Sequence, residues 1–95
     1  MFNVNKEIEK GVCKLALEGR LDTTTSADLE KVIEETKEGL IDLTFDLEKL
    51  EYISSAGLRV LLAAQKIMNK QGTMKVTNAN ETIMEIFDVT GFSDI

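Results

Sequence analysis

The sequence predicts a single small α/β domain, with a mixed β-sheet covered by helices in the order β-β-α-β-α-β-α. Segments with alternating apolar residues, as in a half-buried strand, are interspersed with segments where apolar residues recur every three or four positions, as in an amphipathic helix. Helices between strands require crossover connections, which predict a mixed sheet covered on at least one face. The 95 residues are 43% hydrophobic, enough for one core, and no repeat or linker divides them. We therefore expect one domain over residues 1–95.

Two strand-like segments open the chain and predict an antiparallel hairpin. The first is "FNVNKEI", from Phe2, and the second is "VCKLALE", from Val12. They are joined by "EKG", in which Gly11 can adopt the positive φ of a tight turn. The apolar residues expected on one side of these strands are Phe2, Val4, Ile8, Cys13, Leu15 and Leu17.

The segment "GRLDTTTSADLEKVIEETKEG" predicts the first helix. Thr25 and Asp28 resemble a capping box at its start, with Asp in place of the usual Glu, and Gly39 is expected to end it. The residues at helical spacing are Leu29, Val32 and Ile33.

The second half continues the alternation of strand and helix. "LIDLTFDL" predicts a strand with Ile41, Leu43, Phe45 and Leu47 on one side. After a short connection, "SAGLRVLLAAQKIMNKQG" predicts a long helix that ends at Gly72. Its apolar stripe is Val60, Leu61, Ala64, Ile67 and Met68, widened by Leu58 and Leu62. "TMKVTN" predicts a short strand, and "NETIMEIFDVTG" a final helix capped by Asn80 and ended by Gly91, with Ile83, Ile86 and Phe87 inward.

Charge and composition exclude several classes of protein. A net charge of -6 argues against a general nucleic-acid binder, which needs a basic face. The single cysteine, Cys13, cannot form an internal disulfide and is expected to be buried packing in a reducing compartment. No apolar run approaches the roughly 18 residues of a membrane span, and the N-terminus lacks the apolar segment of a secretory signal. We expect a cytoplasmic protein.

The residues for common catalytic chemistry are missing. There is no histidine to serve as the usual general base or zinc ligand, and no glycine-rich phosphate loop. The acidic pair Glu34–Glu35 fits a solvated helix face. We therefore expect neither an enzyme nor a bound metal or cofactor.

The stretch "EYISSAGLRVLLAAQ" places Ser54 and Ser55 directly before an apolar helix. One interpretation is structural, with one of the serines capping the helix. The other is chemical. Gly57 lets neighbouring groups come close, and Arg59 lies one turn after Ser55. Together with the free N–H groups and the dipole of a helix start, they would accommodate a phosphate on that serine.

The chain resembles the STAS domain of anti-sigma factor antagonists. The resemblance covers essentially Met1 to Ile95 and rests on "YISSAGLRVLL", "LIDLTFDL", "LEGRLD" and "IFDVTGF", which occur in the family's order and spacing. It implies a small α/β domain of the bacterial cytosol without catalytic activity. When unphosphorylated, such proteins bind an anti-sigma factor that is also a serine kinase, which frees the sigma factor. The kinase phosphorylates a serine at this helix start, and a phosphatase restores the protein.

The resemblance also implies site residues. Alignment through Gly57-Leu58 places the phosphoacceptor at Ser55, with Ser54, expected before the cap, as second choice. Ser54 stands where the family often has Asp, and Ala56 where it often has a second serine. The implied partner-binding residues are Asp22, Thr24, Ser54, Ala56, Gly57, Leu58, Arg59 and Leu62.

Two other functions fit the same residues. One is a STAS scaffold in a larger assembly or a regulatory unit of a transporter, in which Ser55 is only a cap. The other is a nucleotide- or anion-binding module that uses the helix start as its site. The chain stops at "GFSDI", where family members usually continue.

Overall fold

The computed structural model describes residues 2–90 and has the predicted order of elements. The elements are β1 (Asn3–Glu9), β2 (Val12–Leu21), α1 (Ser26–Thr36), β3 (Asp42–Ile53), α2 (Ser55–Asn69), β4 (Thr73–Thr77) and α3 (Glu81–Thr90). The four strands form one sheet in the order β1-β2-β3-β4. β1 and β2 are antiparallel, whereas β3 runs parallel to both of its neighbours. The predicted mixed sheet is thereby confirmed.

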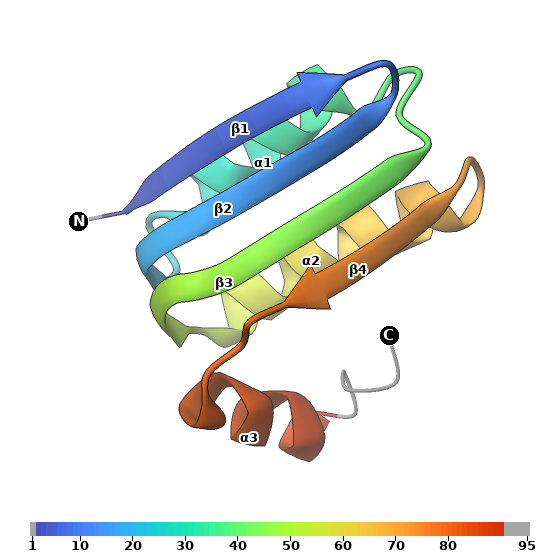
Figure 1. The fold of residues 1–95 in the computed structure, drawn as a ribbon. Helices are drawn as coiled ribbons and strands as arrows, with labels where there is room; N and C mark the ends of the chain where they lie inside the picture. The colour runs from blue at the N-terminus through green and yellow to red at the C-terminus, as the bar shows by residue number, and fades with distance from the viewer. Residues whose placement is uncertain (1, 91–95) are drawn as a thin grey trace.

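The helices lie unevenly about the sheet. Figure 1 shows α1 and α2 together on one face, and no helix within residues 2–90 covers the opposite face, which is turned toward the viewer. α3 lies beside the carboxyl-terminal part of β3, where the Asn80 side-chain amide donates to the Leu50 carbonyl at 3.1 Å. The Asn80 carboxamide oxygen also accepts the Ile83 N–H at 2.9 Å, so the predicted cap of α3 is confirmed. Gly91, expected to end this helix, lies outside the described residues.

The core fills the space between the sheet and α1 and α2, and Ile83 and Phe87 of α3 join it as predicted, with Ile86 partly buried against it. The predicted alternation in β2 is confirmed and runs to the end of the strand, since Cys13, Leu15, Leu17 and Leu21 are all buried. Burial raises the pKa of the Cys13 thiol, as expected for a packing residue. Within residues 2–90, no helix is long and apolar enough to span a membrane.

The hairpin turn is confirmed, but two of the apolar residues that alternation placed on the core side at that end of the sheet are exposed. Gly11 has φ +82°, and β1 pairs with β2 in antiparallel register. Ile8 pairs with the buried Cys13 and so lies on the same side of the sheet, but it is 53% exposed. Ile41 is 55% exposed and precedes β3, whereas the adjacent Leu40 takes the buried position. Ile8 therefore lies on the predicted side of the sheet but outside the core, whereas the prediction that Ile41 faces the core is wrong.

The two longer helices end earlier than the sequence suggested. Lys37 is the C-cap of α1, and Gly39 follows with φ +78°. α2 ends at Asn69 rather than at Gly72. Gly72 is needed for a different reason, since a Cβ there would lie 1.9 Å from the Ile41 carbonyl oxygen. Glycine thus allows the chain to pass the Ile41 backbone as it enters β4.

β3 extends six residues beyond the predicted end at Leu47, to Ile53. Pairing with β2 passes from Ala16↔Asp46 to Glu18↔Lys49, and again from Gly19↔Leu50 to Arg20↔Tyr52. Each step inserts one extra residue in β3, which is a β-bulge. The bulges turn Leu47, Leu50 and Ile53 to the core at intervals of three. They also set Ile53 opposite Leu21, so both strands end together.

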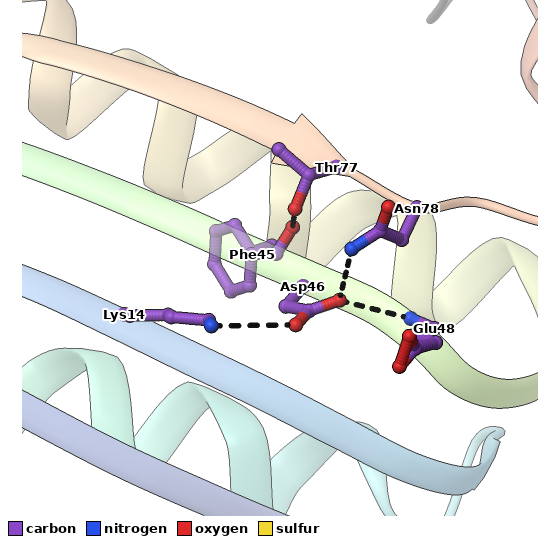
Figure 2. Close-up of polar contacts among 6 residues, drawn as sticks. All are labelled: Lys14, Phe45, Asp46, Glu48, Thr77 and Asn78. Atoms are coloured by element: carbon purple, nitrogen blue, oxygen red, sulfur yellow. Dashed lines mark hydrogen bonds and ion pairs between the residues drawn. The ribbon is translucent and has the colours of Figure 1, made fainter.

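A polar cluster holds the first bulge on the face of the sheet that no helix within residues 2–90 covers, called the bare face below. The Asp46 carboxylate accepts the Glu48 backbone N–H and the Asn78 side-chain amide, each at 3.1 Å, and its second oxygen lies 3.5 Å from the Lys14 ammonium (Figure 2). In the same view the Thr77 hydroxyl lies 3.5 Å from the Phe45 carbonyl oxygen. Asp46 thereby connects β2, the bulge in β3 and the residue after β4.

Asp46→Asn is expected to lower the free energy of unfolding by about 1 kcal/mol near neutral pH, because it removes the charge that strengthens these contacts. The Asn78 amide, the Glu48 N–H and Lys14 hold the pKa of Asp46 below its usual 3.8. Since the folded-state pKa is lowered, this stabilisation is present above the ordinary pKa and is lost as pH falls through the lowered one. Urea unfolding across pH should therefore show the two proteins converging in acid. Glu48→Gln, which keeps the N–H, is the control, and a difference independent of pH contradicts the prediction.

Candidate functional site

The two serines at the start of α2 have different roles. Ser54 is the N-cap, since its hydroxyl oxygen accepts the Gly57 N–H at 3.2 Å and its carbonyl accepts the Leu58 N–H at 2.9 Å. Ser55 is the first residue of the helix and is exposed, and its hydroxyl forms no hydrogen bond with any residue in 2–90. The expectation that Ser54 precedes the cap is therefore wrong by one residue. One hydroxyl holds the helix start, and the next one points to solvent.

Gly57 lets the first turn of α2 approach the sheet. A Cβ at this position would lie 2.8 Å from Leu21 Cγ and 2.9 Å from Ile53 Cγ1. Both side chains are fully buried at the ends of their strands. The prediction that a missing side chain here allows a close approach is confirmed. This packing sets how closely the turn that contains Ser54 and Ser55 approaches the ends of β2 and β3.

The loop after β2 is hydrogen-bonded close to the start of α2. The Ser54 N–H donates to the Leu21 carbonyl at 2.8 Å, which joins the end of β3 to the residue before Asp22. One oxygen of the Asp22 carboxylate accepts the backbone N–H groups of Thr24 and Thr25, both at 3.0 Å. Mainly through the Thr25 N–H, these contacts lower the pKa of Asp22, so its carboxylate stays charged beside the helix start.

Thr25 has a role that the sequence analysis missed. It occupies the N-cap position of α1, yet its side chain does not cap the helix, so the predicted capping box is wrong. Its hydroxyl instead accepts the Asp22 N–H and donates to the Arg20 carbonyl, both at 2.8 Å. The hydroxyl is thereby turned toward the loop and closes it. The Asp22–Thr25 spacing is the sequence signal for this arrangement.

Some of the other predicted contact residues are exposed and can touch a partner, and others are buried beneath them. Leu58 is only 6% exposed and Gly57 is buried, so neither offers side-chain surface to a partner. Arg59 is exposed and, with the half-buried Ala56, lines an open depression between α1 and α2. Leu62 is 43% exposed one turn further along α2. The accessible set is therefore Asp22, Thr24, Ser55, Ala56, Arg59 and Leu62, and the half-buried Ser54 lies beside it.

The electrostatics at the start of α2 favour an anion. The first turn contains no acidic residue, and the N–H groups of Ser55 and Ala56 have no intrahelical acceptor, as at any helix start. Arg59 forms no ion pair with another residue of the described part of the chain. Among those residues, no group of three or more Cys, Asp or Glu side chains is placed to hold a metal ion.

Ser54→Ala is expected to lower the free energy of unfolding by about 1 kcal/mol, because the Gly57 N–H loses its acceptor. Ser55→Ala should change it by less than about 0.5 kcal/mol, because that hydroxyl has no partner to lose. Chemical denaturation of both variants measures the difference. Equal losses, or a larger loss for Ser55→Ala, would contradict the assignment of the cap to Ser54.

Comparison with known proteins identifies the family of the chain. Residues 3–95 match the STAS domain family. The chain is 30% identical over 98 residues to the anti-sigma-B factor antagonist of Bacillus subtilis (strain 168), covering 99% of this chain and 89% of the relative.

Solved structures share the fold. The crystal structure of an anti-sigma factor antagonist from Mycobacterium paratuberculosis superimposes with a TM-score of 0.89 at 23% identity, covering 99% of this chain and 81% of that one. The phosphorylated form of the Bacillus cell fate determinant SpoIIAA gives a TM-score of 0.76 at 15% identity, covering 99% and 86%. The family match, the relative and the shared fold agree along nearly the whole length, and the chain belongs to the STAS domain family.

Proposed function

We propose that the protein is an anti-sigma factor antagonist controlled by phosphorylation of Ser55. In its unphosphorylated form it binds an anti-sigma factor that is also a serine kinase, and it thereby frees the sigma factor in a bacterial cytoplasm. Phosphorylation of Ser55 ends the binding, and a phosphatase restores it. The name of the Bacillus subtilis relative and the existence of a phosphorylated form of SpoIIAA support this proposal.

The proposal rests mainly on one observation: the two serines have different environments, one capping the helix and the other exposed. A phosphoacceptor must be reachable by a kinase, and its modification must leave the fold intact. Ser55 is exposed, whereas the Ser54 hydroxyl holds the helix start. A phosphate on Ser55 would lie near free N–H groups and the positive end of α2, so the fold would tolerate it.

The effect on binding follows from charge. A phosphate adds roughly -1.5 to -2 charges at neutral pH. At the centre of an interface it would have to lose water or would repel acidic groups, and either effect weakens binding. The proposed contact surface consists of Asp22, Thr24, Ser55, Ala56, Arg59 and Leu62, supported from below by Gly57 and Leu58.

The test is to mix the purified protein with each candidate anti-sigma kinase of its genome, with and without adenine nucleotide, and to follow complexes by size-exclusion chromatography. We expect a complex with one kinase and release of the sigma factor held by it. A STAS scaffold would bind none of them, and a nucleotide-binding module would instead give heat on titration with nucleotide alone. Either of those results would overturn the proposal.

A further inference from the structure

Beside the candidate site, an arginine and a tyrosine form a cation–π pair at the ends of two strands. Arg20 and Tyr52 are register partners in β2 and β3, and the Arg20 guanidinium lies 4.4 Å from the centroid of the Tyr52 ring. The following residues, Leu21 and Ile53, point into the core. Because side chains alternate along a strand, Arg20 and Tyr52 lie on the bare face of the sheet.

The cation–π contact with Tyr52 restrains Arg20 and leaves its hydrogen-bond donors free. Arg20 Cζ lies over the Tyr52 ring, a cation–π contact that does not need the N–H groups as hydrogen-bond donors. Arg20 is exposed, and its side chain forms no hydrogen bond or ion pair with any residue in 2–90. Its donors form a planar fork that matches a carboxylate in two parallel hydrogen bonds. A side chain that is already oriented loses less conformational freedom on binding than a free one.

The position of this pair relates it to the site. Arg20 lies two residues before Asp22, and its carbonyl accepts the Thr25 hydroxyl that closes the Asp22 loop. Its positive charge also contributes to the lowered pKa of Asp22. A cation and an anion therefore lie close together at the end of β2. A complementary partner presents the opposite order, with a carboxylate facing Arg20 and a cation facing Asp22.

We propose that Arg20, held over Tyr52, is a specificity-determining residue that binds a carboxylate of the anti-sigma factor. This inference rests on the proposed function. It assigns to the partner an acidic side chain at this contact, so a related anti-sigma factor with a basic or apolar side chain there is rejected.

The experiment measures the affinity of the kinase that binds the wild-type protein for a set of variants, by calorimetry at two salt concentrations. Arg20→Glu should weaken binding by about 30-fold, because it puts two like charges together. Arg20→Lys should weaken it by about 5-fold, because the charge stays but the fork is lost. Tyr52→Phe keeps the ring and should stay within about twofold. Lys75→Glu is the matched control, since it makes the same charge change on the same face but on β4.

The outcomes separate this inference from the proposed function. Binding of Arg20→Glu as tight as that of Lys75→Glu would overturn the role of Arg20 and leave the proposed function intact. Failure of every kinase to bind the wild-type protein would overturn the proposed function and the inference with it. Circular dichroism of each variant checks folding, and Arg20→Lys tests the contact with the charge retained.

Discussion

Gly57→Val is expected to lower the free energy of unfolding by about 3 kcal/mol and to displace the start of α2. A Cβ at this position already meets Leu21 Cγ at 2.8 Å and Ile53 Cγ1 at 2.9 Å, and valine adds two methyl groups. Neither neighbour can give way easily, because both are buried at the ends of paired strands. The steric conflict would displace the turn that contains Ser54 and Ser55.

Gly57→Ala makes the same test on a smaller scale, and urea unfolding measures both variants. Alanine favours a helix over glycine by about 1 kcal/mol, so a site without steric conflict would gain stability. We expect a net loss of about 1 kcal/mol instead. Ala63→Gly, at an exposed position of the same helix, measures the propensity difference alone. A Gly57→Ala protein more stable than the wild type would contradict the close packing of α2 on the strand ends.

Ser55→Asp is expected to weaken the complex with the anti-sigma kinase by about 100-fold, because it places a charge in the proposed contact surface. The same substitution should leave the fold intact or slightly stabilise it, since an acidic residue in the first turn interacts favourably with the helix dipole. Calorimetric titration measures the affinity, and thermal unfolding measures the stability. The combination of stable fold and lost binding is the property required of a switch.

Ser55→Asn is the matched control, because it has nearly the shape of aspartate and no charge. We expect its affinity to stay within about tenfold of the wild type. If Asn and Asp weaken binding equally, bulk rather than charge is responsible. If Ser55→Asp binds like the wild type, Ser55 lies outside the interface and the proposed contact surface is wrong.

Periodicity predicted the order of the elements because burial on one side imposes a repeat of two on strands and of 3.6 on helices. β3 shows where that signal ends. Its second half buries Leu47, Leu50 and Ile53 at intervals of three, a spacing typical of a helix rather than a strand. Only the pairing with β2 reveals two bulges in that segment. From the sequence alone, this segment is therefore predicted to be a short connection between strand and helix.

Local polar residues were harder to predict than the apolar ones. Ser54 and Ser55 are identical side chains at adjacent positions, and the cap is decided by where the chain leaves β3, which the Ser54–Leu21 hydrogen bond fixes. Thr25 illustrates the same point, since a hydroxyl at a helix start can bond to the helix or back to the preceding loop. Ile8 lies on the side that alternation predicts, but alternation does not show how far the covering helices extend. Ile41 precedes β3, and the adjacent Leu40 is buried in its place.

The most direct test of the central claim is to map the phosphate after incubating the protein with ATP and the anti-sigma kinase that binds it. Intact mass spectrometry with peptide mapping should show one added phosphate on Ser55. The phosphate should be absent from Ser55→Ala and retained by Ser54→Ala. A phosphate on Ser54, or none in the presence of the bound kinase, would contradict the assignment of Ser55 as the switch.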